Sequence, residues 1–217
     1  SGSGADRVYS LDTLPQEYST CGVGDYRLSA AEVEQTDGSL LLDLRYTGYG
    51  IRPGKYELEG RPAFHGQGWE TLSVILRDPS SGVEVELLYG VCEEDDLITR
   101  AARLTNRGSG DVRLCQAMSL CLDMNGNLNR TGLDFITFHG GHVRERNMSR
   151  APVHHGLQGV DSVRGVSSHQ YNPFVMLCER RAGEDAGLCY GAALLYSGNF
   201  TAQVEQSMTK GLYWWLD

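Results

Sequence analysis

Histidines are the side chains of this sequence best suited to bind a metal ion or to carry a proton. Five of them lie in the second half of the chain, at His139, His142, His154, His155 and His169. His139 and His142 are three residues apart across two glycines, whereas His154 and His155 are adjacent and would face opposite sides of a strand. No carboxylate pattern accompanies them. The spacing favours surface or hydrogen-bonded histidines, so we predict no metal ion and no cofactor.

A serine and a histidine acting together would give a nucleophilic site. Such a site needs a nucleophile turn such as Gly-x-Ser-x-Gly, and the sequence contains none. The run Ser167-Ser168-His169 does not by itself bring a hydroxyl and an imidazole into attack geometry. The sequence therefore gives no support to serine-based catalysis.

Paired carboxylates of a glycosidase are harder to recognise, because two acids roughly 5–10 Å apart in space obey no spacing rule in the sequence. The candidates in polar segments are Asp12, Glu17, Asp25, Asp43 and Glu145. A structural interpretation is favoured for them, with Asp12 and Asp25 in turns and with Asp43 and Glu145 as partners of arginines.

Arginines and tryptophans offer binding surfaces. Only Lys55 and Lys210 among the 19 basic residues are lysines, so 17 are arginines. Four of these arginines cluster, at Arg144, Arg146, Arg150 and Arg164. They suit bidentate ion pairs in a loop network, or a site for a carboxylate or for sugar hydroxyls, and the first is favoured. The tryptophans are Trp69, Trp214 and Trp215, which could stack on a sugar ring but more often belong to a core or an interface.

Alternating apolar residues predict that strands position these side chains. Residues 112–124 are apolar at every second position except Gln116, which predicts one long strand with a buried face. Residues 72–76 and 83–89 alternate in the same way. No Gly- and Pro-free window longer than about ten residues shows helical periodicity.

Glycine-rich turns separate these runs. Asp37-Gly38, Pro53-Gly54, Asn125-Gly126 and Gly140-Gly141 are examples, and the chain contains 27 glycines in 217 residues. Many short strands with regular turns predict an all-β sandwich of about a dozen or more antiparallel strands. Without a linker or a repeat, we expect residues 1–5 to be a tag or linker remnant and residues 6–217 to form a single domain.

Charge and cysteine content limit the partners and the compartment. The formal net charge of −9 gives no positive field for phosphates, so nucleic acid is excluded as an expected partner. No run of about 18 apolar residues is present, so we expect no membrane partner. The six cysteines form no C-x-x-C pair, which favours free buried thiols in a reducing compartment and a cytoplasmic protein.

Seven short segments, in order along residues 6–205, carry a resemblance to a known family. They are Ser10-Leu11-Asp12-Thr13-Leu14 with Glu17-Tyr18, Gly24-Asp25-Tyr26-Arg27, Asp43-Leu44-Arg45-Tyr46, Ile98-Thr99-Arg100, Arg144-Glu145-Arg146, Arg164-Gly165 with Ser167-Ser168-His169 and Asn172-Pro173-Phe174, and Tyr196-Ser197-Gly198-Asn199-Phe200 with Ala202-Gln203-Val204-Glu205. With these segments the chain resembles the N-terminal domain of glycoside hydrolase family 36 α-galactosidases, the melibiase group.

The resemblance implies a β-supersandwich of two large packed antiparallel sheets, similar to galactose mutarotase, that precedes a catalytic (β/α)₈ barrel. In the family two barrel aspartates perform retaining hydrolysis of terminal α-galactose, as in melibiose and raffinose. This chain contains neither barrel segment, so we expect it to be inactive alone and to serve as a scaffold and as a subunit contact. The family also implies a homo-oligomer, a tetramer by resemblance.

Two departures from the family pattern bear on the site. The family usually has Leu-Pro-Gly-Ala-Trp before Arg-Glu-Arg, and its tryptophan reaches a galactose site; here the equivalent position is His142. An imidazole can donate or accept a hydrogen bond but offers less stacking area. The resemblance thus makes His142 and Arg7 the expected substrate-binding residues. The chain also departs from the family after Glu205, where residues 207–217 are shorter than expected.

A second interpretation stays open at this point. The chain could be a free-standing sugar-binding or mutarotase-like supersandwich protein, which would need a histidine and a glutamate of its own as base and acid. The resemblance to a domain that precedes a barrel favours the first interpretation.

Overall fold

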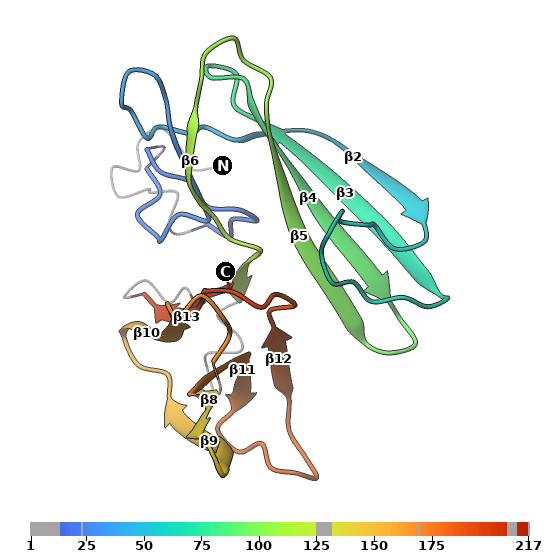
Figure 1. Ribbon diagram of the computed structural model, residues 1–217, viewed down its shortest axis with the longest axis vertical. Helices are drawn as coiled ribbons and strands as arrows, with labels where there is room; N and C mark the ends of the chain where they lie inside the picture. Colours follow the sequence, from blue (N-terminus) through green and yellow to red (C-terminus); the bar gives the residue numbers. More distant parts are fainter. Residues whose placement is uncertain (1–13, 23, 125–131, 169, 208–211, 217) are drawn as a thin grey trace. The chain divides into compact units, whose positions relative to one another are not determined.

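The computed structural model describes residues 14–22, 24–124, 132–168, 170–207 and 212–216. These residues form fourteen β-strands and no helix (Figure 1), which confirms the all-β prediction. No helix that could cross a membrane occurs among them. The strands are β1 (Ala31–Glu34), β2 (Arg45–Pro53), β3 (Trp69–Arg77), β4 (Val83–Cys92), β5 (Leu97–Asn106), β6 (Arg113–Ala117), β7 (Leu120–Met124), β8 (Leu133–Gly141), β9 (Arg144–Pro152), β10 (Gly156–Ser162), β11 (Tyr171–Glu179), β12 (Cys189–Ala193), β13 (Phe200–Gln206) and β14 (Leu212–Leu216).

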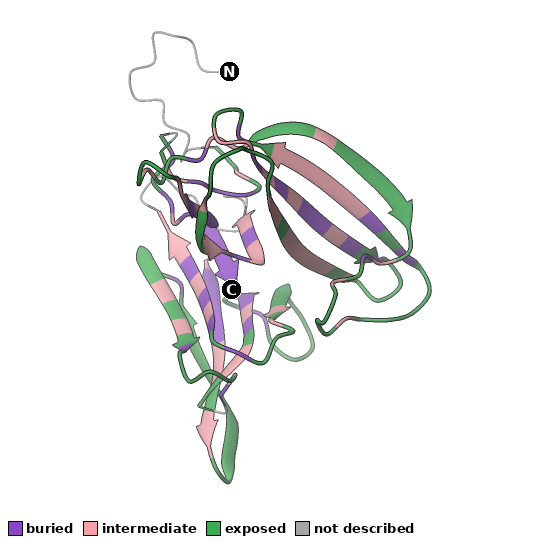
Figure 2. Cartoon of the chain, turned by 45° about the horizontal axis from the view of Figure 1, so that its top comes forward, coloured by how far each residue is buried: buried purple, intermediate pink, exposed green. Residues whose placement is uncertain are grey.

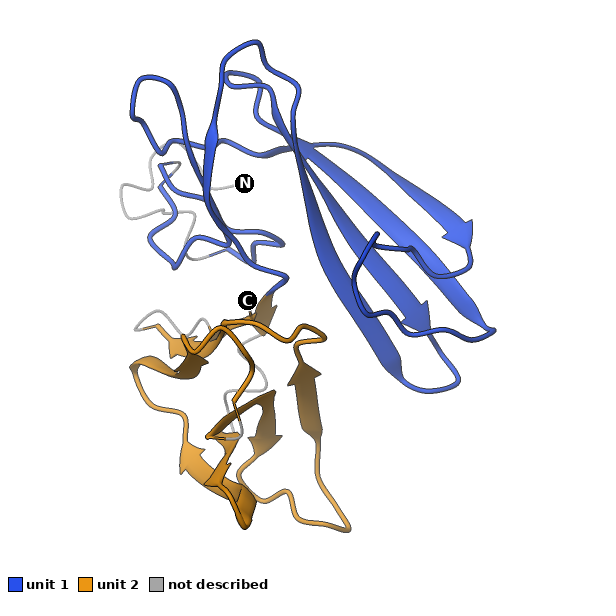
Figure 3. Ribbon diagram, in the orientation of Figure 1, with its two compact units in different colours: residues 1–120 blue, residues 121–217 orange. Residues whose placement is uncertain are grey.

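The strands pair into four antiparallel sheets, where the sequence predicts two larger ones. Their strand orders are β1-β6, β2-β3-β4-β5, β10-β13-β14-β7 and β12-β11-β8-β9. The chain divides into two compact units, Ser1–Leu120 and Cys121–Asp217 (Figure 3). Unit 1 holds the first two sheets and unit 2 the other two, with β7 starting at the boundary. Several packed antiparallel sheets are consistent with the predicted supersandwich, and both units fall inside the range predicted as one domain.

The four-stranded sheet of unit 1 is built around β4, where the predicted alternation is confirmed. Val83, Val85 and Leu87 are at most 2% exposed, while Glu84 and Glu86 on the opposite face are half-buried. The ribbon β1-β6 covers part of the apolar face, because residues from β1, β4, β5 and β6 line one apolar cleft. Burial of these aliphatic side chains supplies the main stabilisation of the sheet.

The other face of this sheet is partly covered by the segment 54–68. The Thr71 hydroxyl donates to the Gly54 carbonyl at 2.7 Å, and the ring of Phe64 stacks on Trp69 with 6.3 Å between centroids. A Cβ atom at Gly90 would lie 3.2 Å from the Lys55 side chain and 3.3 Å from the Tyr56 ring, so glycine at this position lets the segment approach β4 closely. Trp69 is 7% exposed and therefore belongs to the core.

The long strand predicted over residues 112–124 is wrong, because the chain changes sheets in its middle. β6 pairs with β1, whereas β7 lies beside β14 in another sheet. At the break the Met118 amide donates to the Ala30 carbonyl at 2.7 Å, and the Tyr18 hydroxyl donates to the Met118 carbonyl at 2.9 Å. These bonds replace the continuous ladder, which leaves Leu114 54% exposed, against the predicted pattern.

Unit 2 has its core around β14, which the segment after Glu205 forms. All five residues of this strand are buried, and Trp214 and Trp215 are 2% and 1% exposed. Because adjacent side chains on a strand point to opposite faces, both faces of the strand are buried. The sheet β12-β11-β8-β9 packs against this sheet through contacts of β11 with β10 and β13. The core interpretation of the two tryptophans is therefore confirmed.

One prediction about the cysteines is wrong. Cys178 and Cys189 are cross-strand partners on β11 and β12 and form a disulfide, although free thiols were predicted at all six positions. The pairing depends on the register of the β11–β12 hairpin, which the separation of 11 residues does not reveal. The other four cysteines are not disulfide-bonded; Cys92 and Cys121 are buried as predicted, Cys21 is half-buried, and Cys115 is exposed.

Candidate functional site

The tip of the β8–β9 hairpin carries His142, the predicted substrate-binding residue, and its side chain is exposed. The two strands pair as far as Gly141 and Arg144, with an irregular register below the tip. A Cβ atom at Gly140 would lie 2.2 Å from the Arg144 carbonyl oxygen, so this position must be glycine. The glycine that looks like part of a simple turn in the sequence therefore lets the tip fold back tightly on itself.

Two residues without the freedom of glycine adopt left-handed backbone at this tip. Val143 has φ 67° and Arg146 has φ 57°. Such a conformation costs on the order of 1–3 kcal/mol and is most unfavourable for a β-branched residue such as Val143. Local side-chain bonds hold the backbone there: the Val143 amide donates to the Glu145 carboxylate at 2.9 Å, and the Asn147 amide group donates to the Arg144 carbonyl at 2.7 Å.

Two further polar loops of unit 2 join this hairpin through hydrogen bonds. The Gly140 amide donates to the Gln170 carbonyl at 3.2 Å, and the Arg164 guanidinium donates to the Gln170 side chain at 2.5 Å. The Gly165 amide donates to the side-chain oxygen of Asn199 at 2.7 Å. We call the segments 138–147, 164–168, 170–173 and 197–199 the loop cluster. The structure thus brings together three of the segments that carry the family resemblance.

The loop cluster is equipped to bind polar groups rather than to catalyse hydrolysis. Glu145 is its single carboxylate, and one of its oxygens already accepts the Val143 amide. A glycosidase needs two carboxyl groups on either side of the scissile bond. In contrast, His142, Arg144 and Arg146 are exposed. Their imidazole and guanidinium groups can form hydrogen bonds with sugar hydroxyls.

Two other candidate carboxylates, Asp25 and Asp43, each pair with an arginine. The Asp25 carboxylate is buried and accepts two bonds of 2.8 Å from the Arg27 guanidinium, which makes a bidentate pair. Asp43 accepts from Arg45 at 2.7 Å on the surface. The predicted arginine pairing is confirmed for Asp43. The Glu145 carboxylate accepts a hydrogen bond from the Val143 backbone amide, two residues away.

Glu17 belongs to a network that sequence reasoning did not find. Its carboxylate accepts hydrogen bonds from the Tyr89 hydroxyl and from the Arg100 guanidinium, the latter at 3.0 Å. The Arg100 guanidinium also lies 4.6 Å from the centre of the Tyr89 ring, a cation–π contact. The three residues are distant in sequence, and only the occurrence of Glu17 and Arg100 in separate resembling segments hinted at their importance.

The arginine cluster separates into different roles. Arg150 donates to the Asp134 carboxylate at 2.6 Å and to the carbonyls of Ala182, Glu179 and Arg180 at 2.8–3.0 Å. This clamp fixes the loop between β11 and β12. For Arg150, the predicted interpretation as an ion-pair residue in a loop network is therefore confirmed.

The predicted histidine positions do not gather into a ligand set. His139, His142, His154 and His155 are exposed, and the ring of His154 contacts the carbonyl of its neighbour at 3.0 Å. In the ranges that the structure describes, no three His, Cys, Asp or Glu side chains are placed to hold a metal ion. Three predicted residues lie outside the described residues, namely Arg7, Asp12 and His169.

Comparison with known proteins places this geometry in a family. The family model for the glycosyl hydrolase family 36 N-terminal domain matches residues 1–213. The bifunctional α-galactosidase/sucrose kinase AgaSK of Mediterraneibacter gnavus is 46% identical over 207 residues, which are 94% of this chain and 22% of that protein. The α-galactosidase AgaA of Geobacillus stearothermophilus is 42% identical over 204 residues, with coverages of 93% and 27%.

Solved structures agree with the relatives. The family 36 α-galactosidase AgaB of Geobacillus stearothermophilus superposes with a TM-score of 0.92 at 40% identity, over 99% of this chain and 30% of that one. An AgaA variant in complex with raffinose gives a TM-score of 0.93 at 38% identity, with coverages of 100% and 30%. The chain thus spans about a quarter of the length of the curated relatives and 30% of these two solved chains.

Proposed function

The chain belongs to the family of glycosyl hydrolase family 36 N-terminal domains, and from this we propose that it is the N-terminal, non-catalytic domain of an α-galactosidase. The whole enzyme would release terminal α-linked galactose from oligosaccharides such as melibiose and raffinose. The observation that carries the proposal is the match over residues 1–213 to a domain that is only 22–30% of its relatives. Catalytic carboxylates would then belong to the remainder of the enzyme.

The loop cluster would contribute a sugar contact to such an enzyme. His142 stands exposed at the end of a hairpin whose backbone is fixed by Gly140 and by the Val143–Glu145 hydrogen bond. A rigid support of this kind reduces the entropy lost when a hydrogen bond to a ligand forms. We place His142, and Arg7 with it, among the substrate-binding residues of the assembled enzyme.

Assembly and location complete the proposal. A homo-oligomer, a tetramer by family resemblance, would allow the exposed hairpin to act at the site of another subunit. A cytoplasmic location would suit an enzyme that cleaves imported oligosaccharides, and the partners would include neither nucleic acid nor a membrane. The net charge of −9 supports the exclusion of nucleic acid.

The reading frame beyond codon 217 tests the proposal directly. A downstream (β/α)₈ barrel with a Lys-Trp-Asp segment, together with raffinose hydrolysis by the full-length product, would support it. A stop codon immediately after residue 217 in the native gene would contradict it and would favour the free-standing sugar-binding protein.

Substitution of His142 in the full-length enzyme tests the proposed contact. His142→Ala should remove one hydrogen bond and lower kcat/KM about two- to twelvefold, which corresponds to 0.5–1.5 kcal/mol. His142→Trp should restore a stacking surface and change the preference among galactosides. If both variants kept the parent kinetics while His142→Ala changed the oligomer mass, His142 would be a subunit contact instead.

A further inference from the structure

We propose that the exposed half of one face of the sheet β2-β3-β4-β5 is a docking surface for the remainder of the α-galactosidase polypeptide. The proposal rests on the proposed function, because it needs a catalytic part beyond this domain. It concerns the residues on the β2 and β3 side of the sheet, which we call the apolar face. Tyr46, Tyr49, Ile51, Leu72, Val74 and Leu76 form it.

A β-bulge gathers the exposed members of the apolar face on one side of β2. Tyr46 pairs with Leu76 and Tyr49 pairs with Val74, although residues three apart on a regular strand would point to opposite faces. The register shift between Tyr46 and Gly48 places both tyrosines on the same face of the sheet. The Thr47 hydroxyl stabilises this bulge by donating a hydrogen bond to the Ile75 carbonyl at 3.0 Å. Tyr46, Tyr49 and Ile51 are 61%, 66% and 66% exposed (Figure 2 shows β2 largely green).

Burial across this face falls steadily from β4 towards the sheet edge. Val85 and Leu87 on β4 are at most 2% exposed, their partners on β3 are half-buried, and β2 is exposed. The buried side is covered by the ribbon β1-β6 and by the segment that carries Glu17, which binds Tyr89 and Arg100 on this same face. The layer that covers this face of the sheet therefore extends over β4 and β5 but not over β2.

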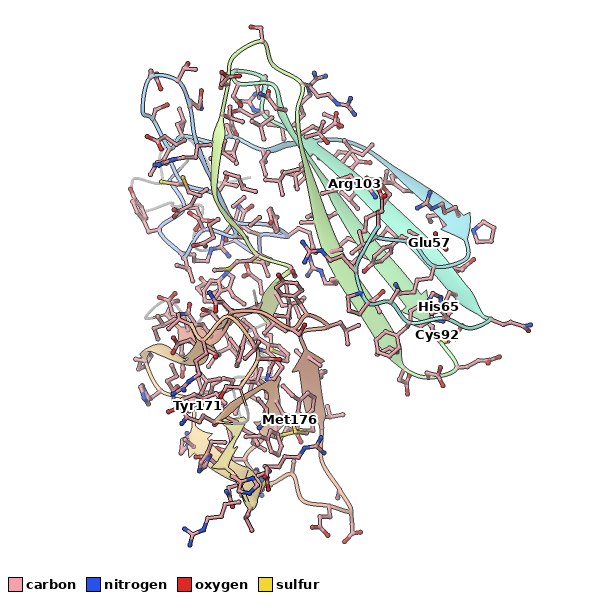
Figure 4. The ribbon with its side chains drawn as sticks, in the orientation of Figure 1. Glu57, His65, Cys92, Arg103, Tyr171 and Met176 are labelled. Carbon is pink, nitrogen blue, oxygen red and sulfur yellow. A yellow bond between two sulfur atoms is a disulfide. The ribbon has the colours of Figure 1, made fainter. Side chains whose placement is uncertain are left out.

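The opposite face of the same sheet shows what a solvated surface looks like in this protein. Where the segment 54–68 does not cover it, it carries a ladder of charges: Arg103, labelled in Figure 4, pairs with Glu86 at 2.5 Å, and Arg107 pairs with Glu84 at 3.2 Å. The apolar face carries aromatic and aliphatic side chains where the opposite face carries these charged pairs. Contiguous apolar patches of this kind mark interaction sites, and tyrosine is enriched in interface cores while charged residues are depleted there.

The length of the relatives identifies the occupant. This chain matches 22–30% of each relative described above, so most of each polypeptide lies outside the part represented here. A sugar ligand fits the face less well, because a sugar site needs polar groups beside the aromatic ring, and the cross-strand partners of Tyr46 and Tyr49 are Leu76 and Val74. An apolar protein surface is the complementary chemistry.

Hydroxyl-radical footprinting of the full-length enzyme tests whether the face is covered. In an interface core, the oxidation of Tyr46 and Tyr49 should be at least about tenfold slower in the native enzyme than in urea. At the exposures of the domain alone, 61% and 66%, the protection would stay below about twofold. Protection below twofold in an active enzyme would overturn the docking surface and leave the proposed function intact.

Two neighbouring substitutions identify what covers the face. Ile51 lies on the apolar face, and Arg52 is exposed on the opposite face of the same strand. In the full-length enzyme, Ile51→Asp should increase proteolytic release of this domain at least about tenfold, because protease cleavage follows the population of the open state. Arg52→Asp should leave the release rate within about twofold of the parent.

The remaining outcomes are separable. If Ile51→Asp lowers the oligomer mass in ultracentrifugation but not the resistance to proteolysis, a second copy of the chain covers the face and the proposal is wrong. If the two Asp variants behave alike, the face has no specific occupant and the proposal is also wrong. The absence of α-galactosidase activity in the parent enzyme, in contrast, would remove the proposed function itself.

Discussion

Strands β14 and β2 are both rich in aromatic residues, yet they have opposite environments. Trp214 and Trp215 of β14 are at most 2% exposed, whereas Tyr46 and Tyr49 of β2 are exposed by 61% and 66%. β14 lies between two partner strands, while β2 forms the edge of its sheet. The difference separates a strand whose aromatic side chains the domain buries by itself from a strand whose aromatic side chains it leaves exposed.

The largest predicted effect follows from deleting a ring from the complete core. Trp214→Ala should lower the free energy of unfolding by about 3–5 kcal/mol, because it removes a fully buried side chain and leaves a cavity. The matched variant Tyr49→Ala should change it by less than about 0.5 kcal/mol in the isolated domain. Urea denaturation measures both, and equal losses for the two variants would remove the contrast between the strands.

The next effect concerns the clamp in unit 2. Arg150→Ala should cost about 2 kcal/mol, because it leaves the mostly buried Asp134 carboxylate and three carbonyls without their donor. Arg180 is the control, since its guanidinium lies 3.8 Å from the same carboxylate and is 52% exposed. Arg180→Ala should cost less than about 0.5 kcal/mol, and a larger loss for this variant would contradict the assignment of the clamp.

A smaller, pH-dependent effect is expected in unit 1. Burial raises the pKa of Asp78, but hydrogen bonds from Ser80 and Ser81 outweigh it, and the pKa lies below its ordinary value. A lowered pKa stabilises the fold above the unfolded value of about 3.9, and this contribution is lost as the pH falls through the folded value. Asp78→Asn should therefore cost about 1–2 kcal/mol at pH 7 and progressively less below pH 4. A difference that stays constant down to pH 3 would show that the charge of Asp78 is not involved.

Sequence patterns predicted the strands better than the sheets. Alternation located β3 and β4, because the alternating apolar residues of each strand lie on one face of the sheet. The same pattern failed at Met118, where the chain changes sheets without a turn signal, and it could not show that β14 is buried on both faces. Which strands pair with one another depends on contacts between residues that are distant in sequence. A local alternation of apolar residues gives no information about those contacts.

The candidate site was predictable in its segments but not in its bonds. The resembling segments around Arg144, Arg164 and Asn199 indeed meet in the loop cluster. Nothing in the sequence revealed that Glu145 accepts a hydrogen bond from the Val143 amide, since this depends on the left-handed backbone at the tip. The Cys178–Cys189 disulfide was missed for a similar reason, because it depends on hairpin register.

The purified 217-residue chain, assayed with p-nitrophenyl α-galactoside, tests the central claim most directly. The claim is that the domain folds and supports an α-galactosidase but carries no catalytic pair of its own. We predict a cooperative unfolding transition and no turnover above the uncatalysed rate. Turnover that disappears when Glu145 or Glu17 is replaced by glutamine would contradict the claim and would place a catalytic carboxylate inside this domain.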